Sequence, residues 1–154
     1  ILNSLNRSHP YEQVAYETYT LENKNKYIGM GMTGSFDKEM REVDFIEFVK
    51  KTMNSTMVKH SKLIEKPIKK VAVLGGSGSF AIESAKLANA DAFITSDLKY
   101  HDFFKAENEI LLLDIGHFES EQFTKNLLQS YLKKKIPNFA ILLSKINTNP
   151  VKYK

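Results

Sequence analysis

The stretch VAVLGGSGS, residues 71–79, joins a short apolar run to a glycine-rich turn. A helical pattern follows at residues 80–88, and a second apolar run follows at residues 92–95. Short apolar runs that alternate with helices are typical of a parallel sheet covered by helices on both faces. This stretch therefore predicts an α/β fold with a mainly parallel sheet.

The same alternation continues toward the carboxyl terminus. Each further segment is set off by polar or turn residues, as expected of separate strands and helices. We expect a short helix at residues 100–106, a strand at 109–115, a long helix at 118–135 and a last strand at 139–143.

The chain before residue 65 has a different pattern, which predicts a partial ferredoxin-like α+β unit that lacks its first strand. Its expected elements are the end of a helix at residues 1–8, a strand at 14–21, a second strand at 27–35 paired with it across 22–26, a helix at 43–53 and a short strand at 57–63. The change of pattern at Glu65-Lys66-Pro67 predicts two domains, 1–65 and 66–154. Because the first residue is Ile1, we expect a processed or trimmed chain, or a fragment.

The composition excludes several classes of protein. The 154 residues are 42% hydrophobic and 26% charged, which is typical of a globular chain and not of a disordered one. The net charge is +4, and 20 of the 22 basic residues are Lys. Proteins that read the edges of bases favour Arg for that purpose, so we expect no specific nucleic-acid partner. The absence of cysteine excludes disulfides, thiolate zinc sites and thiol nucleophiles. No apolar run reaches the length of a membrane span, so we expect no membrane partner and a cytoplasmic location.

Unusual residues follow three of the predicted strands. These segments are residues 75–79, 95–102 and 114–121. Ligands of open α/β sheets bind beyond the carboxyl ends of the strands. We therefore expect all three segments to meet at one edge of the sheet.

The glycine turn has three interpretations. Gly76, Gly78 and Ala81 fit the pattern G-x-G-x-x-A, with Asp97 about one strand further on, as in a dinucleotide site. The turn also suits an anion or phosphate cradle at a helix start. The third interpretation is a plain structural turn, in which glycine permits a tight strand-to-helix connection.

His117 and Glu121 are four residues apart at the start of a predicted helix. That spacing places both side chains on one face, where imidazole and carboxylate suit a divalent metal. The competing interpretation is a helix start whose acidic residues favour the positive end of the helix dipole. A metal site needs at least one further ligand, for which His101 and Asp97 are the local candidates.

A family resemblance rests on several short motifs taken together. They are HPYE and VAY within residues 9–16, GMG with Gly34 at 29–34, VAV and GGSG at 71–78, T-x-DLKYHD at 95–102, D-x-GH-x-x-x-E at 114–121, and NTNP at 147–150. With these motifs the chain resembles the NIF-three-like family, whose members are often named GTP cyclohydrolase 1 type 2 homologues.

The resemblance implies an identity for both domains. Residues 1–65 would be the second half of an inserted domain similar to the PII and CutA folds, and residues 66–154 the carboxyl-terminal part of a metal-binding α/β domain. It also implies two divalent metal ions, with zinc, iron and manganese as the options. Two of the ligands would be His117 and Glu121, and the others would come from an amino-terminal half that this chain lacks. Ser96 departs from the glycine usual in the family.

Two functions follow from these expectations. The first is a metal-dependent hydrolase of the GTP cyclohydrolase type, acting on a small-molecule substrate, with a phosphorylated one as an option. His101 would be its acid–base candidate, and Gly76, Ser77, Gly78, Lys99 and Tyr100 its candidate substrate-binding residues. The second is a non-catalytic metal-binding or regulatory protein. The resemblance implies a ring-like homo-oligomer in either case.

Overall fold

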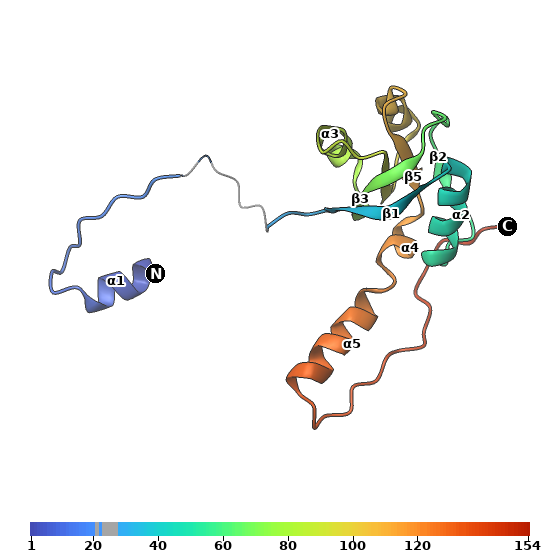
Figure 1. Cartoon of the computed structure of the whole chain (residues 1–154). Helices are drawn as coiled ribbons and strands as arrows, with labels where there is room; N and C mark the ends of the chain where they lie inside the picture. The colour runs from blue at the N-terminus through green and yellow to red at the C-terminus, as the bar shows by residue number, and fades with distance from the viewer. Residues whose placement is uncertain (21, 23–27) are drawn as a thin grey trace.

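A five-stranded sheet lies at the centre of the computed structural model, which describes residues 1–20, 22 and 28–154 (Figure 1). The strand order is β1-β3-β4-β5-β2. The strands are β1 (Met32–Met40), β2 (Lys59–His60), β3 (Ile68–Ser77), β4 (Ala92–Ser96) and β5 (Leu111–Asp114). The central strands β3, β4 and β5 run parallel, and the edge strands β1 and β2 pair antiparallel with them. The predicted α/β class with a mainly parallel sheet is confirmed.

Side-chain alternation along the strands creates two cores, one on each face of the sheet. Ala72, Phe93 and Leu112 point to the face covered by α3 (Ile82–Leu87) and the 3-10 helix η2 (Tyr100–Ala106). Their sequence neighbours point to the other face, where α2 (Glu42–Thr52) contributes Phe45 and Val49. Helices therefore cover both faces, as the continuous apolar runs predict.

Several helices differ in detail from the prediction. Residues 80–88 form a 3-10 turn, η1 (Ser79–Ala81), followed by α3, and residues 118–135 form two helices instead of one. These are α4 (His117–Glu121) and α5 (Thr124–Lys135). Between them, the Gln122 side chain donates a hydrogen bond of 2.7 Å to the Met53 carbonyl at the end of α2. This contact anchors α4 to the body of the protein, while α5 projects away from it (Figure 1).

The predicted hairpin at residues 14–35 is wrong in the part of the chain that the structure describes. Residues 14–20 are almost wholly exposed and form no strand, whereas the second predicted strand begins later, as β1. β1 pairs with β3 (Met32 opposite Val73), because the buried sheet offers a partner for its main-chain groups. Residues 21 and 23–27, which include most of the predicted turn, lie outside the described residues.

The last predicted strand, residues 139–143, is also wrong. This segment has no strand partner among the described residues, and Leu142 is 89% exposed. An apolar run becomes a strand only where a neighbouring strand satisfies its backbone. The short strand predicted at residues 57–63 is present, but only as the two residues of β2.

The remaining elements lie around this centre. α1 (Leu2–Ser8) confirms the predicted helix, buries none of its residues and stands apart from the sheet in Figure 1. β1, α2 and β2 precede Pro67, yet they share the sheet and one core with the later strands. The assignment of residues 1–65 to an inserted domain stays a prediction.

No helix in the described ranges has the length and apolar character needed to cross a membrane.

Candidate functional site

The carboxyl ends of β3, β4 and β5 meet at one edge of the sheet and are tied together by side chains. Thr95 Oγ1 donates a hydrogen bond of 3.0 Å to the Gly76 carbonyl. Ser77 donates through its hydroxyl to Asp97 Oδ2, and this same oxygen lies 2.5 Å from His117 Nδ1. The structure thus brings together residues from the three segments that the sequence marks as unusual.

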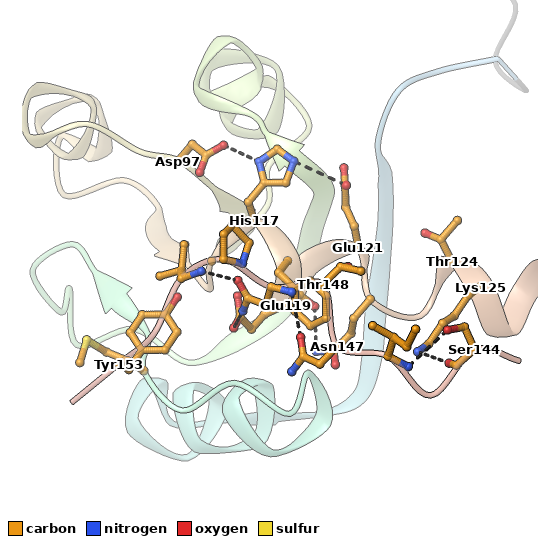
Figure 2. Close-up of a pocket in the computed structure, with 18 of the residues that line it drawn as sticks. Asp97, His117, Glu119, Glu121, Thr124, Lys125, Ser144, Asn147, Thr148 and Tyr153 are labelled. Carbon is orange, nitrogen blue, oxygen red and sulfur yellow. Dashed lines mark hydrogen bonds and ion pairs between the residues drawn. The ribbon is translucent and has the colours of Figure 1, made fainter.

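α4 holds His117 and Glu121 on one face, with His117 Nε2 3.5 Å from Glu121 Oε2 (Figure 2). Both side chains are about half exposed. The glycine turn approaches this pair closely. Gly76 has a φ of +70°, and a Cβ there would lie 2.7 Å from Glu121 Oε1 and 3.6 Å from His117 Cε1. A side chain at this position would be strained by the left-handed backbone, and the Glu121 carboxylate would have to move to make room for it.

Asp97 binds the imidazole on the opposite side from Glu121. Its φ is +57°, in the left-handed region that few residues other than glycine adopt. Hydrogen bonds from Ser77 and then from His117 lower the pKa of Asp97, against the opposing effect of burial. The hydrogen bond to Asp97 raises the pKa of His117, an effect that partial burial opposes and the charges of Asp97 and Glu121 reinforce.

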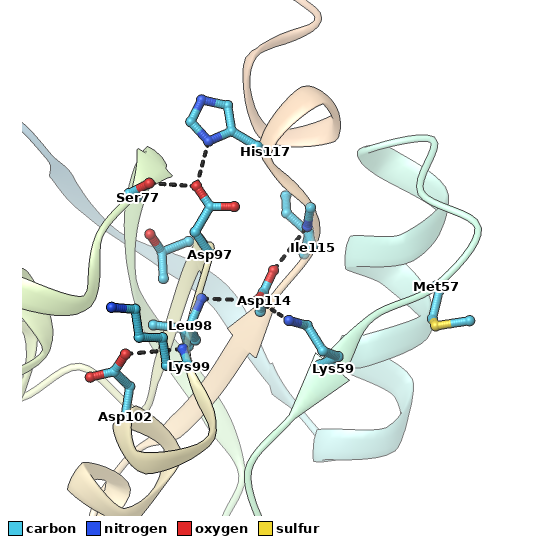
Figure 3. A network of polar contacts seen from close by, with 12 residues as sticks. Met57, Lys59, Ser77, Asp97, Leu98, Lys99, Asp102, Asp114, Ile115 and His117 are labelled. Carbon is cyan, nitrogen blue, oxygen red and sulfur yellow. Dashed lines mark hydrogen bonds and ion pairs between the residues drawn. The ribbon is translucent and has the colours of Figure 1, made fainter. Parts of the chain in front are cut away.

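Asp114 joins the two loops that carry Asp97 and His117 (Figure 3). Its side chain is only 2% exposed and accepts hydrogen bonds from the backbone N–H of Leu98 (3.0 Å) and of Gly116 (3.1 Å). Lys59 Nζ lies 2.6 Å from Asp114 Oδ2 and supplies the opposite charge. Sequence reasoning missed Lys59, because no local pattern connects β2 with a residue 55 positions later.

A groove of about 1060 Å³ runs beside His117 and Glu121. α4, the start of α5 and the carboxyl-terminal segment 144–153 form its walls (Figure 2). Lys59, Lys125 and Lys145 are among its lining residues. The sequence motif NTNP falls on this wall, although nothing in its composition indicates which element it contacts.

The other predicted site residues lie elsewhere or are already engaged. The N–H of Gly76 donates to Ser120 Oγ (2.9 Å) and the N–H of Gly78 to the Ser96 carbonyl (3.5 Å), so both groups have partners within the protein. Lys99 precedes η2, where its N–H donates to Asp102 Oδ2 (3.0 Å). The rings of Tyr100 and His101 pack on Phe104 and do not line the groove.

Ser96, the departure from the family pattern, is fully buried in the described structure. Its Oγ has no hydrogen-bond partner there. The positive φ of this turn falls on Asp97 and not on Ser96, so the turn accepts serine without a left-handed backbone at that position.

The fold and these contacts define an α/β protein with a His–Glu pair at the carboxyl edge of a parallel sheet. The sequence matches the family described as Duf34/NIF3 (NGG1p interacting factor 3) over residues 5–150. The chain therefore belongs to this family, and the resemblance carried by the sequence motifs is confirmed.

Known relatives agree with this assignment. A Staphylococcus epidermidis protein named GTP cyclohydrolase 1 type 2 homolog is 36% identical over 151 residues, which cover 96% of this chain and 41% of that protein. The crystal structure of a Bacillus cereus protein related to NIF3 is similar, with a TM-score of 0.78, 32% identity, and coverage of 99% of this chain and 43% of that one. A Staphylococcus aureus structure has a TM-score of 0.77 and 28% identity, over 99% of this chain and 51% of that one. The chain spans about two fifths of the length of the curated relatives it matches.

Proposed function

We propose that His117 and Glu121 are two ligands of a divalent-metal centre, which holds two metal ions in a polypeptide of the relatives' length. The observation that carries this proposal is the approach of Nε2 and Oε2 to 3.5 Å on one face of α4. Gly76 supports it, because the missing Cβ lets the glycine turn lie next to the Glu121 carboxylate. Imidazole and carboxylate are donors that zinc, iron and manganese all accept.

Asp97 suits a supporting role better than the ligand role that the sequence suggests for it. It contacts Nδ1, so a proton shared there leaves the lone pair of Nε2 free on the side of Glu121. Metal-binding histidines usually donate their second N–H to a carboxylate in this way, which fixes the ring and raises its basicity. The geometry therefore favours Asp97 as the residue that orients His117.

The two proposed ligands are only part of a metal-binding set. The described residues contain no group of three or more His, Asp or Glu side chains that could hold a metal ion. A stable site needs at least three protein ligands. We infer that the remaining ligands belong to the part of the polypeptide that the relatives have and this chain does not span. His101, the other local candidate, packs on Phe104 instead.

A metal-dependent hydrolase is the reaction class we propose, and the relatives' name points to a GTP-like substrate. A bound metal pair would supply a nucleophilic water near neutral pH and polarise the bond to be cleaved. This chain's residues would bind and orient the substrate. The groove next to His117 gives the room, and Lys125 and Lys145 on its walls would contact an anionic group such as a phosphate. Lys59 is already paired with Asp114, and the acidic side chains of Asp97, Glu119 and Glu121 line the same groove.

A non-catalytic metal-binding or regulatory role is the second candidate. The observation that favours it is the position of His101, the predicted acid–base residue, outside the groove. Proton transfer needs a group within hydrogen-bond reach of the substrate. Under this proposal the same pair would bind metal, and homo-oligomers would display or sense it.

The test is metal content and turnover in a polypeptide of the relatives' length that contains this chain. We expect two divalent ions per chain and metal-dependent hydrolysis of a phosphorylated or cyclic amide substrate. His117→Ala should abolish both metal binding and turnover, whereas His101→Ala should retain the metal. Bound metal without turnover on any substrate would support the non-catalytic role. Unchanged metal content in His117→Ala would refute the site itself.

A further inference from the structure

α4 is too short to hold its own position. It has five residues, and isolated helices of that length are unstable in water, so contacts outside the helix must fix it. His117 and Glu121 share the face that looks on the glycine turn. Glu119 lies two residues from each, about 200° around the helix, and so points to the opposite side.

Glu119 is the buried contact on that opposite side. It is 7% exposed, and its Oε1 accepts a hydrogen bond of 3.2 Å from Asn149 Nδ2. Its Oε2 packs on Gly116, whose φ is +91°. A Cβ at Gly116 would overlap with this carboxylate and lie 2.9 Å from Tyr153 Oη. Gly116, the residue before α4, is therefore enclosed between Glu119 and Tyr153 of the carboxyl-terminal segment.

Asn149 is held in place by its own segment. Its N–H donates to Asn147 Oδ1 (2.8 Å), and its Oδ1 accepts from the N–H of Val151 (3.0 Å). Asparagine side chains that bond the backbone two residues away form Asx turns, which fix a short chain without a helix or strand. Asn149 of the motif NTNP, residues 147–150, thus presents its Nδ2 group to Glu119 on α4.

We propose that residues 147–153 form a strap that sets the position of α4, with Asn149 and Glu119 as positioning residues for the His117–Glu121 pair. The proposal rests on the proposed function of that pair, although the strap itself is a feature of the metal-free chain. Gln122 supports the same helix from its other end through Met53. The strap and α2 would thus hold α4 together with the glycine turn, whose Gly76 N–H donates to Ser120 Oγ.

Hydrogen exchange in the 154-residue chain tests the strap. The N–H groups of Ser120 and Gln122 close α4 by bonding to the Gly116 carbonyl (3.0 Å) and the Phe118 carbonyl (2.8 Å). Asn149→Ala should speed exchange at both amides about fivefold, since it removes the side-chain hydrogen bond to Glu119 and, with it, the bond from the Val151 N–H that fixes the strap. Glu119→Ala should have the same effect, and Glu119→Gln, which keeps a carbonyl acceptor, should restore slow exchange.

Gln129→Ala is the matched control. It also removes a side-chain amide contact to the carboxyl-terminal segment, the 2.7 Å bond from Gln129 Nε2 to the Ile141 carbonyl, but this contact lies on α5. Exchange at Ser120 and Gln122 should stay as in the parent chain. Equal acceleration by both variants would mean general loosening and would overturn the strap, as would unchanged exchange in Asn149→Ala.

A second readout connects the strap to the metal pair. The imidazole signals of His117 at fixed pH, followed during a zinc titration, should report weaker binding by about tenfold in Asn149→Ala and no change in Gln129→Ala. If a polypeptide of the relatives' length that contains this chain shows no zinc response while the exchange pattern holds, the proposed function fails and the strap stands. If zinc binds equally to all variants, the positioning role is wrong and the metal site stands.

Discussion

At the scale of single residues, the site depends on which imidazole nitrogen meets which carboxylate. The i, i+4 spacing of His117 and Glu121 could be read from the sequence, because helix geometry fixes which positions share a face. The sequence also marks Asp97 as a neighbour. Only the structure shows that Asp97 meets Nδ1 and Glu121 faces Nε2, since that choice depends on how a turn after β4 packs against α4.

The His117–Asp97 contact predicts a pH dependence. Because the folded-state pKa of His117 is raised above its ordinary 6.5, the pair stabilises the fold fully below that value and loses this contribution as pH rises through the raised pKa. The pKa of Asp97 is lowered from its ordinary 3.8, so its contribution to the stability of the fold is lost as pH falls through this lowered pKa. Asp97→Asn should lower the His117 pKa in the metal-free chain, as measured by NMR titration.

Ser77→Ala serves as the control for that titration. This variant removes a hydrogen bond to Asp97 but leaves the charge of Asp97 in place. The pKa of His117 in Ser77→Ala should therefore stay above the pKa of His117 in Asp97→Asn. An equal His117 pKa in the parent chain and in Asp97→Asn would show that the two side chains are not paired in solution.

Gly76 provides a second residue-scale prediction. Gly76→Ala should destabilise the chain by about 1–2 kcal/mol, because a Cβ is strained at a φ of +70° and approaches Glu121 Oε1 at 2.7 Å. Gly34→Ala is the matched control, since a Cβ there meets no atom within 4 Å and the backbone is not left-handed. Thermal unfolding should show a lower midpoint for the first variant only. Equal midpoints would contradict a left-handed backbone at Gly76.

At the scale of elements, the sequence predicts best what is decided locally. The helix at α2 and the strands β3, β4 and β5 follow from periodicity and apolar runs within each segment. The break between α4 and α5 was not predicted, and it falls at Gln122, whose side chain contacts Met53, 69 residues earlier, which no local pattern reveals. The predicted hairpin failed for the same reason: β1 takes its partner from β3 and not from its neighbour in sequence.

The contrast between the core and α5 gives a prediction at this scale. Leu112 in β5 is fully buried, whereas Leu127 on α5 is 70% exposed and that helix buries none of its residues. Leu112→Ala should cost about 2–5 kcal/mol of unfolding free energy. Leu127→Ala should change it by less than about 0.5 kcal/mol. Denaturant unfolding measures both, and a large loss in Leu127→Ala would show that α5 is packed in solution.

At the scale of the whole molecule, a parallel sheet brings three separate loops to one edge and places a groove beside them. The fold class and the family could be predicted from the sequence, because the alternation of runs and helices and the set of motifs extend over most of the chain. The antiparallel edges β1 and β2 could not, since each pairs with a strand far along the chain. The carboxyl-terminal wall of the groove has no periodic pattern to reveal it.

The most direct test of the central claim, that His117 and Glu121 bind metal together, is an NMR titration of this chain with zinc. Because the described residues contain no group of three or more His, Asp or Glu side chains that could hold a metal ion, we expect weak, saturable binding that shifts the His117 imidazole signals at Nε2. Glu121→Gln should weaken zinc binding. The control Glu83→Gln, which changes an exposed carboxylate on α3, should leave zinc binding unchanged. Binding that is unaffected by Glu121→Gln, or shifts confined to other histidines, would contradict the account.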